Sequence, residues 1–73
     1  FILDIDSFVS IDIYNIKGEL IRNLFHQKQF TKGKHEAKWD GKNWLGKDVA
    51  SGLYFFKISS KKQTLIRKLL LLK

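Results

Sequence analysis

The sequence predicts an all-β fold in which six or seven short antiparallel strands form a sandwich. Apolar and polar residues alternate along most of the chain, β-branched and aromatic residues are abundant, and turn residues recur at intervals of about eight to twelve positions. At 73 residues, 44% of them hydrophobic, the chain has room for one domain, covering residues 1–73, with a modest core. This apolar content is too high for a disordered basic tail.

The first third of the chain predicts a hairpin. From Phe8 to Ile16, β-branched residues alternate with polar ones, the pattern of a half-buried strand. Lys17-Gly18 then supplies a tight turn, and Glu19 to Phe25 resumes an extended run. Phe1 to Ile5, upstream, has room for one more strand.

The middle of the chain predicts a loop, a strand and a second loop. Gln27 to Gly33 is polar and reads as a loop with Phe30 as its one apolar anchor. Lys34 to Trp39 alternates again and predicts a third strand, with His35 on the inward face. Asp40 to Gly52 is rich in Gly, Asp, Asn and Ser, the residues typical of turns.

The last third predicts a second hairpin. Leu53 to Ser60 carries apolar residues on both faces, which predicts a central strand buried from two sides. Lys61-Lys62 turns the chain, and Gln63 to Leu72 returns as the last strand. Leu69 to Leu72 could equally continue a helix begun at Thr64, but an antiparallel return is the simpler connection, and the run is far too short to span a bilayer. These elements together favour an immunoglobulin-like (fibronectin III-like) sandwich.

Charge and composition bound the function without defining it. The net charge of +7 and a pI near 9.9 permit binding to polyanions. The bases are scattered, however, so a solvated lysine-rich surface is the favoured interpretation and no nucleic acid partner is expected. There is no Cys, which excludes disulfides and thiolate metal sites. Because the sequence begins with Phe1 and shows no leader, we expect a segment of a longer protein whose signal peptide lies upstream.

No catalytic constellation is visible, so the sequence predicts neither an enzyme nor a cofactor. No nucleophile has a base within evident reach, and no Ser lies in a G-x-S-x-G context. His35 shares a predicted face with Ala37 and Trp39, so we expect a packed histidine there. His26 follows Phe25 at a strand end, where we expect it to be solvated.

Two clusters invite binding hypotheses. The oxygens of Asp40, Asn43 and Asp48 suggest calcium, but their spacing departs from D-x-[DN]-x-[DN]-G and the neighbouring Lys42 and Lys47 are repulsive. Asx turns that hold a tight corner are therefore favoured.

Four aromatic residues, Trp39, Trp44, Tyr54 and Phe56, could form a stacking platform for sugars or bases. Trp39 and Phe56 alternate with apolar neighbours and are better candidates for the core. Trp44 lies in the turn-rich loop, where it either caps an end of the sandwich or is exposed as a contact residue.

Three blocks of sequence resemble a known family. Val9 to Arg22 resembles the "V.I.IYN..G..V." opening of the type A C-terminal sorting domains of the Bacteroidetes type IX secretion system, relatives of the immunoglobulin-like domain of the flagellar hook-capping protein. Trp39 to Asn43 with Gly46 to Lys57 is similar to the family's "WDG.D..G..V.SG.Y.Y.." signature. Arg67 to Lys73 is similar to its terminal "..KK..L.K" strand.

The resemblance implies a non-catalytic C-terminal module of an exported bacterial protein, secreted or held at the cell surface. Its partners would be the secretion machinery or other protein subunits, which could read the last strand as an added strand at a sheet edge. The residues expected to carry this role are Arg67, Lys68, Leu70, Leu72 and Lys73, with Trp44 as a loop contact. One alternative is an assembly module, hook-cap-like or in a filament, that packs through exposed strand edges and forms homo-oligomer or filament contacts. A second alternative is a basic polyanion binder.

Overall fold

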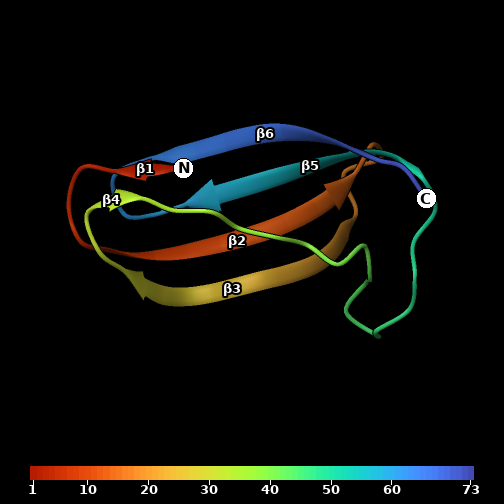
Figure 1. Cartoon of the computed structure of the whole chain (residues 1–73), viewed down its shortest axis with the longest axis horizontal. Helices are drawn as coiled ribbons and strands as arrows, with labels where there is room; N and C mark the ends of the chain where they lie inside the picture. Colours follow the sequence, from red (N-terminus) through yellow and green to blue (C-terminus); the bar gives the residue numbers. More distant parts are fainter.

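The computed structural model describes residues 1–73 as six strands in two antiparallel sheets, without a helix, which confirms the all-β prediction (Figure 1). The strands are β1 (Ile2–Leu3), β2 (Ser7–Asn15), β3 (Leu20–Phe30), β4 (Gly33–Lys34), β5 (Gly52–Ser59) and β6 (Thr64–Leu71). One sheet has the order β3-β2-β5-β6, and the other is the short pair β1-β4. No helix is present that could cross a membrane.

Strand β2 lies at the centre of the larger sheet and supplies the core. It pairs with β3 on one side and β5 on the other. Its inward residues Val9, Ile11 and Ile13 are fully buried, as their alternation predicts. Burying a branched aliphatic side chain of this size contributes about 1.5–3 kcal/mol, so β2 dominates the stability of this small fold.

The second layer of the sandwich is thin. It consists of β1, β4 and the extended segment that follows β4, which crosses one face of the larger sheet (Figure 1). Leu3 of β1 is buried against Val9, and Phe30 packs edge-on against Phe1 at a centroid distance of 5.3 Å. The opposite face of the larger sheet has no covering layer.

The predicted strand over Lys34 to Trp39 is wrong as a strand, although its inward face is correct. Only Gly33–Lys34 pairs with β1 as a strand. His35 extends this contact, because its N–H donates to the Phe1 carbonyl and its carbonyl accepts from the Phe1 ammonium, each over 2.8 Å. The residues from Glu36 to Trp39 pair with no strand. The following residues still alternate in burial, and His35 is half-buried with its Nε2 2.6 Å from the carbonyl oxygen of Thr31. The packed histidine is therefore confirmed.

The predicted loop over Gln27 to Gly33 is also wrong, because β3 continues to Phe30. The strand passes this polar stretch by a change of register next to Gln27, whose φ is 48°. The Gln27 N–H donates to the hydroxyl of buried Ser10 over 3.0 Å. Polar residues are tolerated here because the strand lies at a sheet edge, where most of its side chains reach water. Phe30 is an apolar anchor, as predicted.

Both predicted hairpins are present. Strands β2 and β3 are joined through the turn at Lys17-Gly18, and β5 and β6 through Lys61-Lys62, so the last segment is a strand and not a helix. One prediction for β5 is wrong, because its second face is not buried. Leu53 is exposed and Phe55 half-buried, since the thin second layer covers only the other face.

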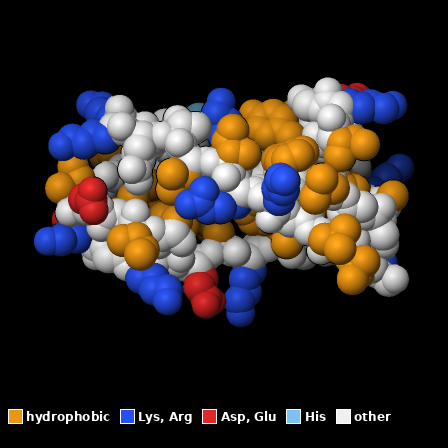
Figure 2. All heavy atoms as spheres, turned by 90° about the horizontal axis from the view of Figure 1, so that it is seen from above, with side chains coloured by type: hydrophobic (Ala, Val, Ile, Leu, Met, Phe, Trp, Pro, Cys, Tyr) orange, Lys and Arg blue, Asp and Glu red, His pale blue; other side chains and the backbone are white.

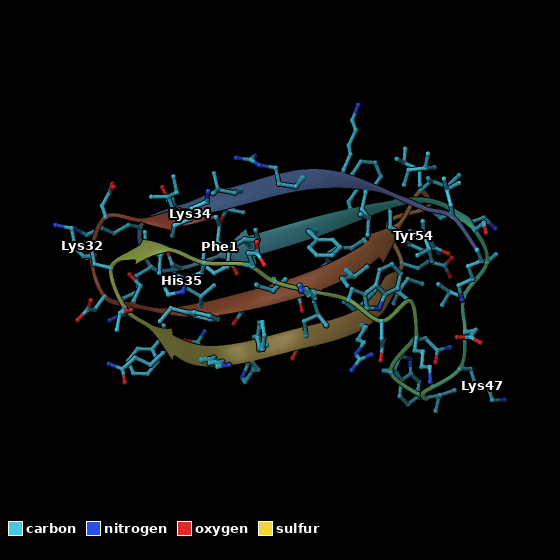
Figure 3. The ribbon with its side chains drawn as sticks, in the orientation of Figure 1. Phe1, Lys32, Lys34, His35, Lys47 and Tyr54 are labelled. Atoms are coloured by element: carbon cyan, nitrogen blue, oxygen red, sulfur yellow. The ribbon has the colours of Figure 1, made fainter.

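A tyrosine fastens the long loop to the sheet. The hydroxyl of Tyr54, in β5, donates to the carbonyl of Ala50 over 2.6 Å, an arrangement like the tyrosine corner of immunoglobulin-like domains. Trp39 packs edge-on against Tyr54 at 5.1 Å and approaches Phe56. Figure 3 places Tyr54 at the end of the sheet from which the loop departs. The core positions predicted for Trp39 and Phe56 are thus only partly realised, because both remain half-buried.

Candidate functional site

The larger sheet ends in two edge strands, β3 and β6. An edge strand presents backbone N–H and C=O groups that lack a partner within the sheet, and these groups can pair with another chain. The two edges of this sheet differ in how far they are covered.

The β3 edge is closed by its own shape and by the long loop. Its pairing with β2 shifts register three times, and such bulges twist an edge away from regular pairing. The N–H of Trp44 donates to the carbonyl of Ile21 over 3.0 Å, which occupies an edge acceptor. Arg22 Nη1 donates to Asp40 Oδ1, which ties the strand to the start of the loop.

The loop that covers β3 is held by amide and carboxylate side chains. Asn43 Oδ1 accepts from the N–H groups of Leu45 and Lys47, each over 3.0 Å, and Asp40 Oδ1 accepts from Lys42 N–H at the same distance. These contacts confirm the Asx turns that the sequence favoured over calcium, because the oxygens are used by the loop's own amides. The described residues contain no cluster of three or more His, Asp or Glu that could hold a metal.

The ion pair between Arg22 and Asp40 at this edge changes the pKa of the Asp40 carboxyl. The hydrogen bond from Arg22 holds the pKa of the Asp40 carboxyl below its ordinary value, with smaller help from the Lys42 N–H, while partial desolvation opposes the shift. Both side chains remain partly exposed to solvent. The pair therefore orders the loop more than it stabilises the fold.

The sequence left two positions open for Trp44, one capping the sandwich and one exposed as a contact residue, and the structure shows the exposed one. Its side chain is 72% exposed, while its backbone lies in the turn closed by the hydrogen bond from Gly46 N–H to Asn43 C=O. Trp44 is bonded to Ile21 at the β3 edge, and β6 forms the opposite edge of the sheet, so the structure does not bring this predicted contact residue together with the residues of the last strand.

The β6 edge is open. Within the β5–β6 hairpin, Ser60 N–H donates to Gln63 C=O over 2.9 Å, and the register continues without a shift to Gly52 and Leu71. Paired groups alternate along an antiparallel ladder. The backbone groups of Leu65, Arg67 and Leu69 are therefore directed toward β5. Those of the alternate residues, Thr64, Ile66, Lys68 and Leu70, are directed away from the sheet.

The side chains of this edge are exposed as well. Leu70 is 62% exposed and Leu72 is 77% exposed. Arg67 and Lys68, which lie earlier on the strand, are also exposed. Arg67 Nη1 donates to the outward carbonyl of Ile66 over 3.1 Å. Of the predicted site residues, Arg67, Lys68, Leu70 and Leu72 therefore lie exposed on β6 or directly after it.

Lys73 behaves differently from the other predicted site residues. Its N–H donates to Ser51 Oγ over 3.1 Å, and its Nζ lies 3.3 Å from the carbonyl oxygen of Gly41 and 3.5 Å from Asp48 Oδ1. Gly41, at φ 77°, packs against Leu71 and the Lys73 stem where a side chain would be strained. Lys73 therefore fastens the end of β6 to the loop.

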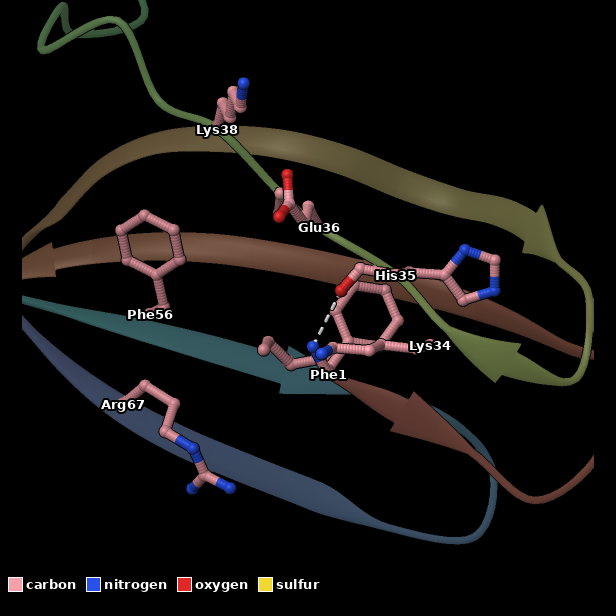
Figure 4. Close-up of a pocket in the computed structure, with 9 residues that line it drawn as sticks. Phe1, Lys34, His35, Glu36, Lys38, Phe56 and Arg67 are labelled. Atoms are coloured by element: carbon pink, nitrogen blue, oxygen red, sulfur yellow. Dashed lines mark hydrogen bonds between the residues drawn. The ribbon is translucent and has the colours of Figure 1, made fainter.

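Two hollows flank the hairpin of β5 and β6. The inner hollow, of about 490 Å³, has Arg67 and Phe56 on one side and the segment after β4 on the other (Figure 4). Lys34 at the end of β4 and Glu36 and Lys38 in the segment after it line this hollow together with Arg67, so cations outnumber carboxylates around it.

The outer hollow, of about 400 Å³, lies on the uncovered face of the sheet. Its lining includes Tyr14, Ile16, Phe55, Ile66 and Lys57. Figure 2, which views the molecule from the side of β6, shows hydrophobic side chains gathered in one half, with Lys and Arg among them. Sequence reasoning missed this surface, although the apolar residues on both faces of β5 were its signal.

The fold and its edges define the class of this protein. A four-stranded antiparallel sheet, covered on one face by a short strand pair and an extended segment, with a long loop fastened by a tyrosine, is a small immunoglobulin-like β-module. The family model described as the FlgD Ig-like domain matches residues 4–64, and the chain belongs to that family, whose domains are typically non-catalytic. Searches of curated proteins and of solved structures found no match. The family match ends at Thr64, where β6 begins.

Proposed function

We propose that this module is the C-terminal sorting and attachment signal of an exported bacterial protein, recognised by the secretion machinery through β6. The resemblance of residues 9–22, 39–57 and 67–73 to type A sorting domains of the type IX system supports this role. The single observation that carries it is the open β6 edge, on which Arg67, Lys68, Leu70 and Leu72 are all exposed. The proposed location of the protein is the cell surface or the medium.

The test is an export assay with point variants. Deleting β6 would leave β5 without its neighbour on one side, so loss of export after a deletion would not separate recognition from unfolding. We would place residues 1–73 behind a signal peptide and a reporter in a host with type IX secretion. The test variant is Lys68→Glu with Leu70→Ser, and the matched control is Lys47→Glu with Leu45→Ser in the exposed loop.

The proposal predicts that the parent and the loop control reach the medium or the cell surface, while the β6 variant stays in the periplasm. Circular dichroism and thermal melting of the purified variants check that both are folded. Equal export of all three proteins, or periplasmic retention of the parent itself, contradicts the proposal.

A second function is an assembly module that packs through strand edges, hook-cap-like or in a filament. The observation that favours it is the combination of the open β6 edge with the apolar outer hollow, because both surfaces are typical of strand-to-strand contacts. Light scattering of the purified chain tests this function. It predicts regular oligomers that Ile66→Asp disperses, whereas a monomer at every concentration argues against it.

A further inference from the structure

We propose that the β6 edge binds an extended segment of another protein in which acidic and large apolar side chains alternate. This inference rests on the proposed function, because it names the partner chemistry for the same strand. The occupant would add a fifth strand to the sheet, next to β6. Three features of the edge determine the segment's chemistry: its free backbone groups, its cationic inner side and its apolar outer side.

The backbone groups set the mode of binding. The outward N–H and C=O groups of Ile66, Lys68 and Leu70 repeat every second residue along a strand without a register shift. This repeat matches the pairing groups of an extended chain. The Arg67 guanidinium that now bonds the Ile66 carbonyl belongs to an exposed, flexible side chain, which an incoming N–H can replace.

The inner side of the edge favours carboxylates. Side chains of an added strand alternate between the two faces of the sheet. Those on the inner face lie beside Arg67 and next to the inner hollow, where Lys34 and Lys38 outnumber Glu36 (Figure 4). A carboxylate opposite Arg67 replaces the hydrogen bond that the guanidinium loses to the strand, and charge-assisted bonds of this kind are the stronger ones.

The outer side of the edge favours large apolar residues. Ile66 and Leu70 are exposed on this face, and the outer hollow adjoins Ile66. Lys68 stands between them, and its aliphatic stem can cover an apolar neighbour while its ammonium remains in water. A segment with apolar residues on this face and acidic residues on the other therefore matches the edge on both sides.

A second copy of this chain is a poorer occupant. Antiparallel pairing of two β6 strands about their middle places Arg67 or Lys68 opposite its own copy, and like charges directly opposite each other destabilise a sheet. The net charge of +7 on each copy adds long-range repulsion.

The test uses the 73-residue chain and a ten-residue synthetic peptide in which isoleucine and glutamate alternate. The control peptide has lysine in place of glutamate. Binding is followed by NMR, through the amide shifts and the exchange rates of the protein. We expect the acidic peptide alone to bind, to shift the amides of β6 and to slow the exchange of Ile66, Lys68 and Leu70.

Two pairs of variants separate strand addition from general charge attraction. Lys68→Pro removes an outward N–H, which edge strands tolerate, whereas Lys68→Ala keeps it. We expect a loss of affinity on the order of tenfold for the proline variant and a smaller loss for the alanine variant. Ile66→Asp should also weaken binding, whereas Leu45→Asp, at 59% exposure against 60% for Ile66, should not.

Several outcomes would overturn the inference. These are equal binding of the lysine peptide, shifts spread over lysines far from β6, or full affinity of both Lys68→Pro and Ile66→Asp. Dimerisation of the chain through β6 would assign the edge to a second copy instead.

If export requires β6 but the acidic peptide does not bind, this inference fails and the proposed function stands. If the peptide binds at β6 while export does not depend on the strand, the proposed function fails and the inference stands.

Discussion

The two edges of the four-stranded sheet differ in how they are protected. The eleven-residue strand β3 is bent by three register shifts, and the loop covers it through the hydrogen bond from Trp44 to Ile21. The eight-residue strand β6 is regular, and its only protection is the charge of Arg67 and Lys68. Bulges and loops close an edge permanently, whereas exposed charges discourage pairing and still admit a partner of opposite charge. The comparison therefore assigns structural closure to β3 and recognition to β6.

The largest expected effect comes from the core shared by both edges. Ile11, in the central strand β2, is fully buried and packs with Val9, Leu3 and Ile58. Ile11→Ala should lower the free energy of unfolding by about 2–5 kcal/mol, through lost apolar burial and the cavity left behind. Urea denaturation checks this. An exposed control, Ile16→Ala, should change stability by less than about 0.5 kcal/mol. A similar loss in both variants would contradict the assignment of the core to β2.

The next effect tests the fastening of the loop that closes β3. Tyr54→Phe removes the hydrogen bond to the Ala50 carbonyl and should cost about 1–2 kcal/mol. Tyr14, on the outer face, is the matched control because its hydroxyl makes no hydrogen bond within the chain. Thermal unfolding of Tyr54→Phe and Tyr14→Phe compares them, and the account is wrong if the two melt at the same temperature.

A smaller effect opens the β3 edge directly. Trp44 is the second residue of a turn whose first and fourth residues are Asn43 and Gly46, a position that proline favours. Trp44→Pro should therefore preserve the turn, remove the N–H that bonds Ile21 and cost about 1 kcal/mol. Trp44→Ala keeps this N–H and should be close to neutral, because the side chain is exposed. Chemical denaturation of both variants measures the difference, and equal stability would show that the loop does not close the edge.

The smallest effect concerns pH at the closed edge. Because Arg22 lowers the pKa of Asp40 in the folded chain, the ion pair contributes fully above the ordinary value of about 3.9. Its contribution is lost as the pH falls through the lowered folded pKa. Arg22→Gln should return the Asp40 pKa toward the ordinary value, as measured by NMR titration of its carboxyl carbon. An unchanged pKa in this variant would contradict the pairing.

The strands were predicted correctly where one face of the strand is buried and the strand pairs with the next one along the chain. The alternation around Ile11 and the return of the chain after Lys61-Lys62 are of this kind, and both hairpins are correct. Gln27 to Phe30 was predicted as loop because an edge strand exposes its side chains and so carries polar residues. Residues after Lys34 alternate like a strand, but pairing depends on which segment of the folded chain lies beside them, which no local pattern encodes.

The candidate site was predicted in part. Arg67, Lys68, Leu70 and Leu72 were named from the last strand, and all are exposed on it or just beyond it. The outer hollow was missed because apolar residues on both faces of a strand look like two-sided burial. Whether a second layer covers Phe55 depends on the path of residues 35–50, which is a property of the whole fold. Lys73 was named with the partner-binding residues, although its contacts with the loop arise only in the folded chain.

The most direct measurement of the central claim is amide hydrogen exchange along β6, residue by residue, in the free chain. The account predicts alternation: slow exchange for Leu65, Arg67 and Leu69, whose N–H groups are directed toward β5, and fast exchange for Ile66, Lys68 and Leu70. Uniformly slow exchange along the whole strand would mean that the outward groups are already paired, and the claim that β6 is the open edge would be wrong.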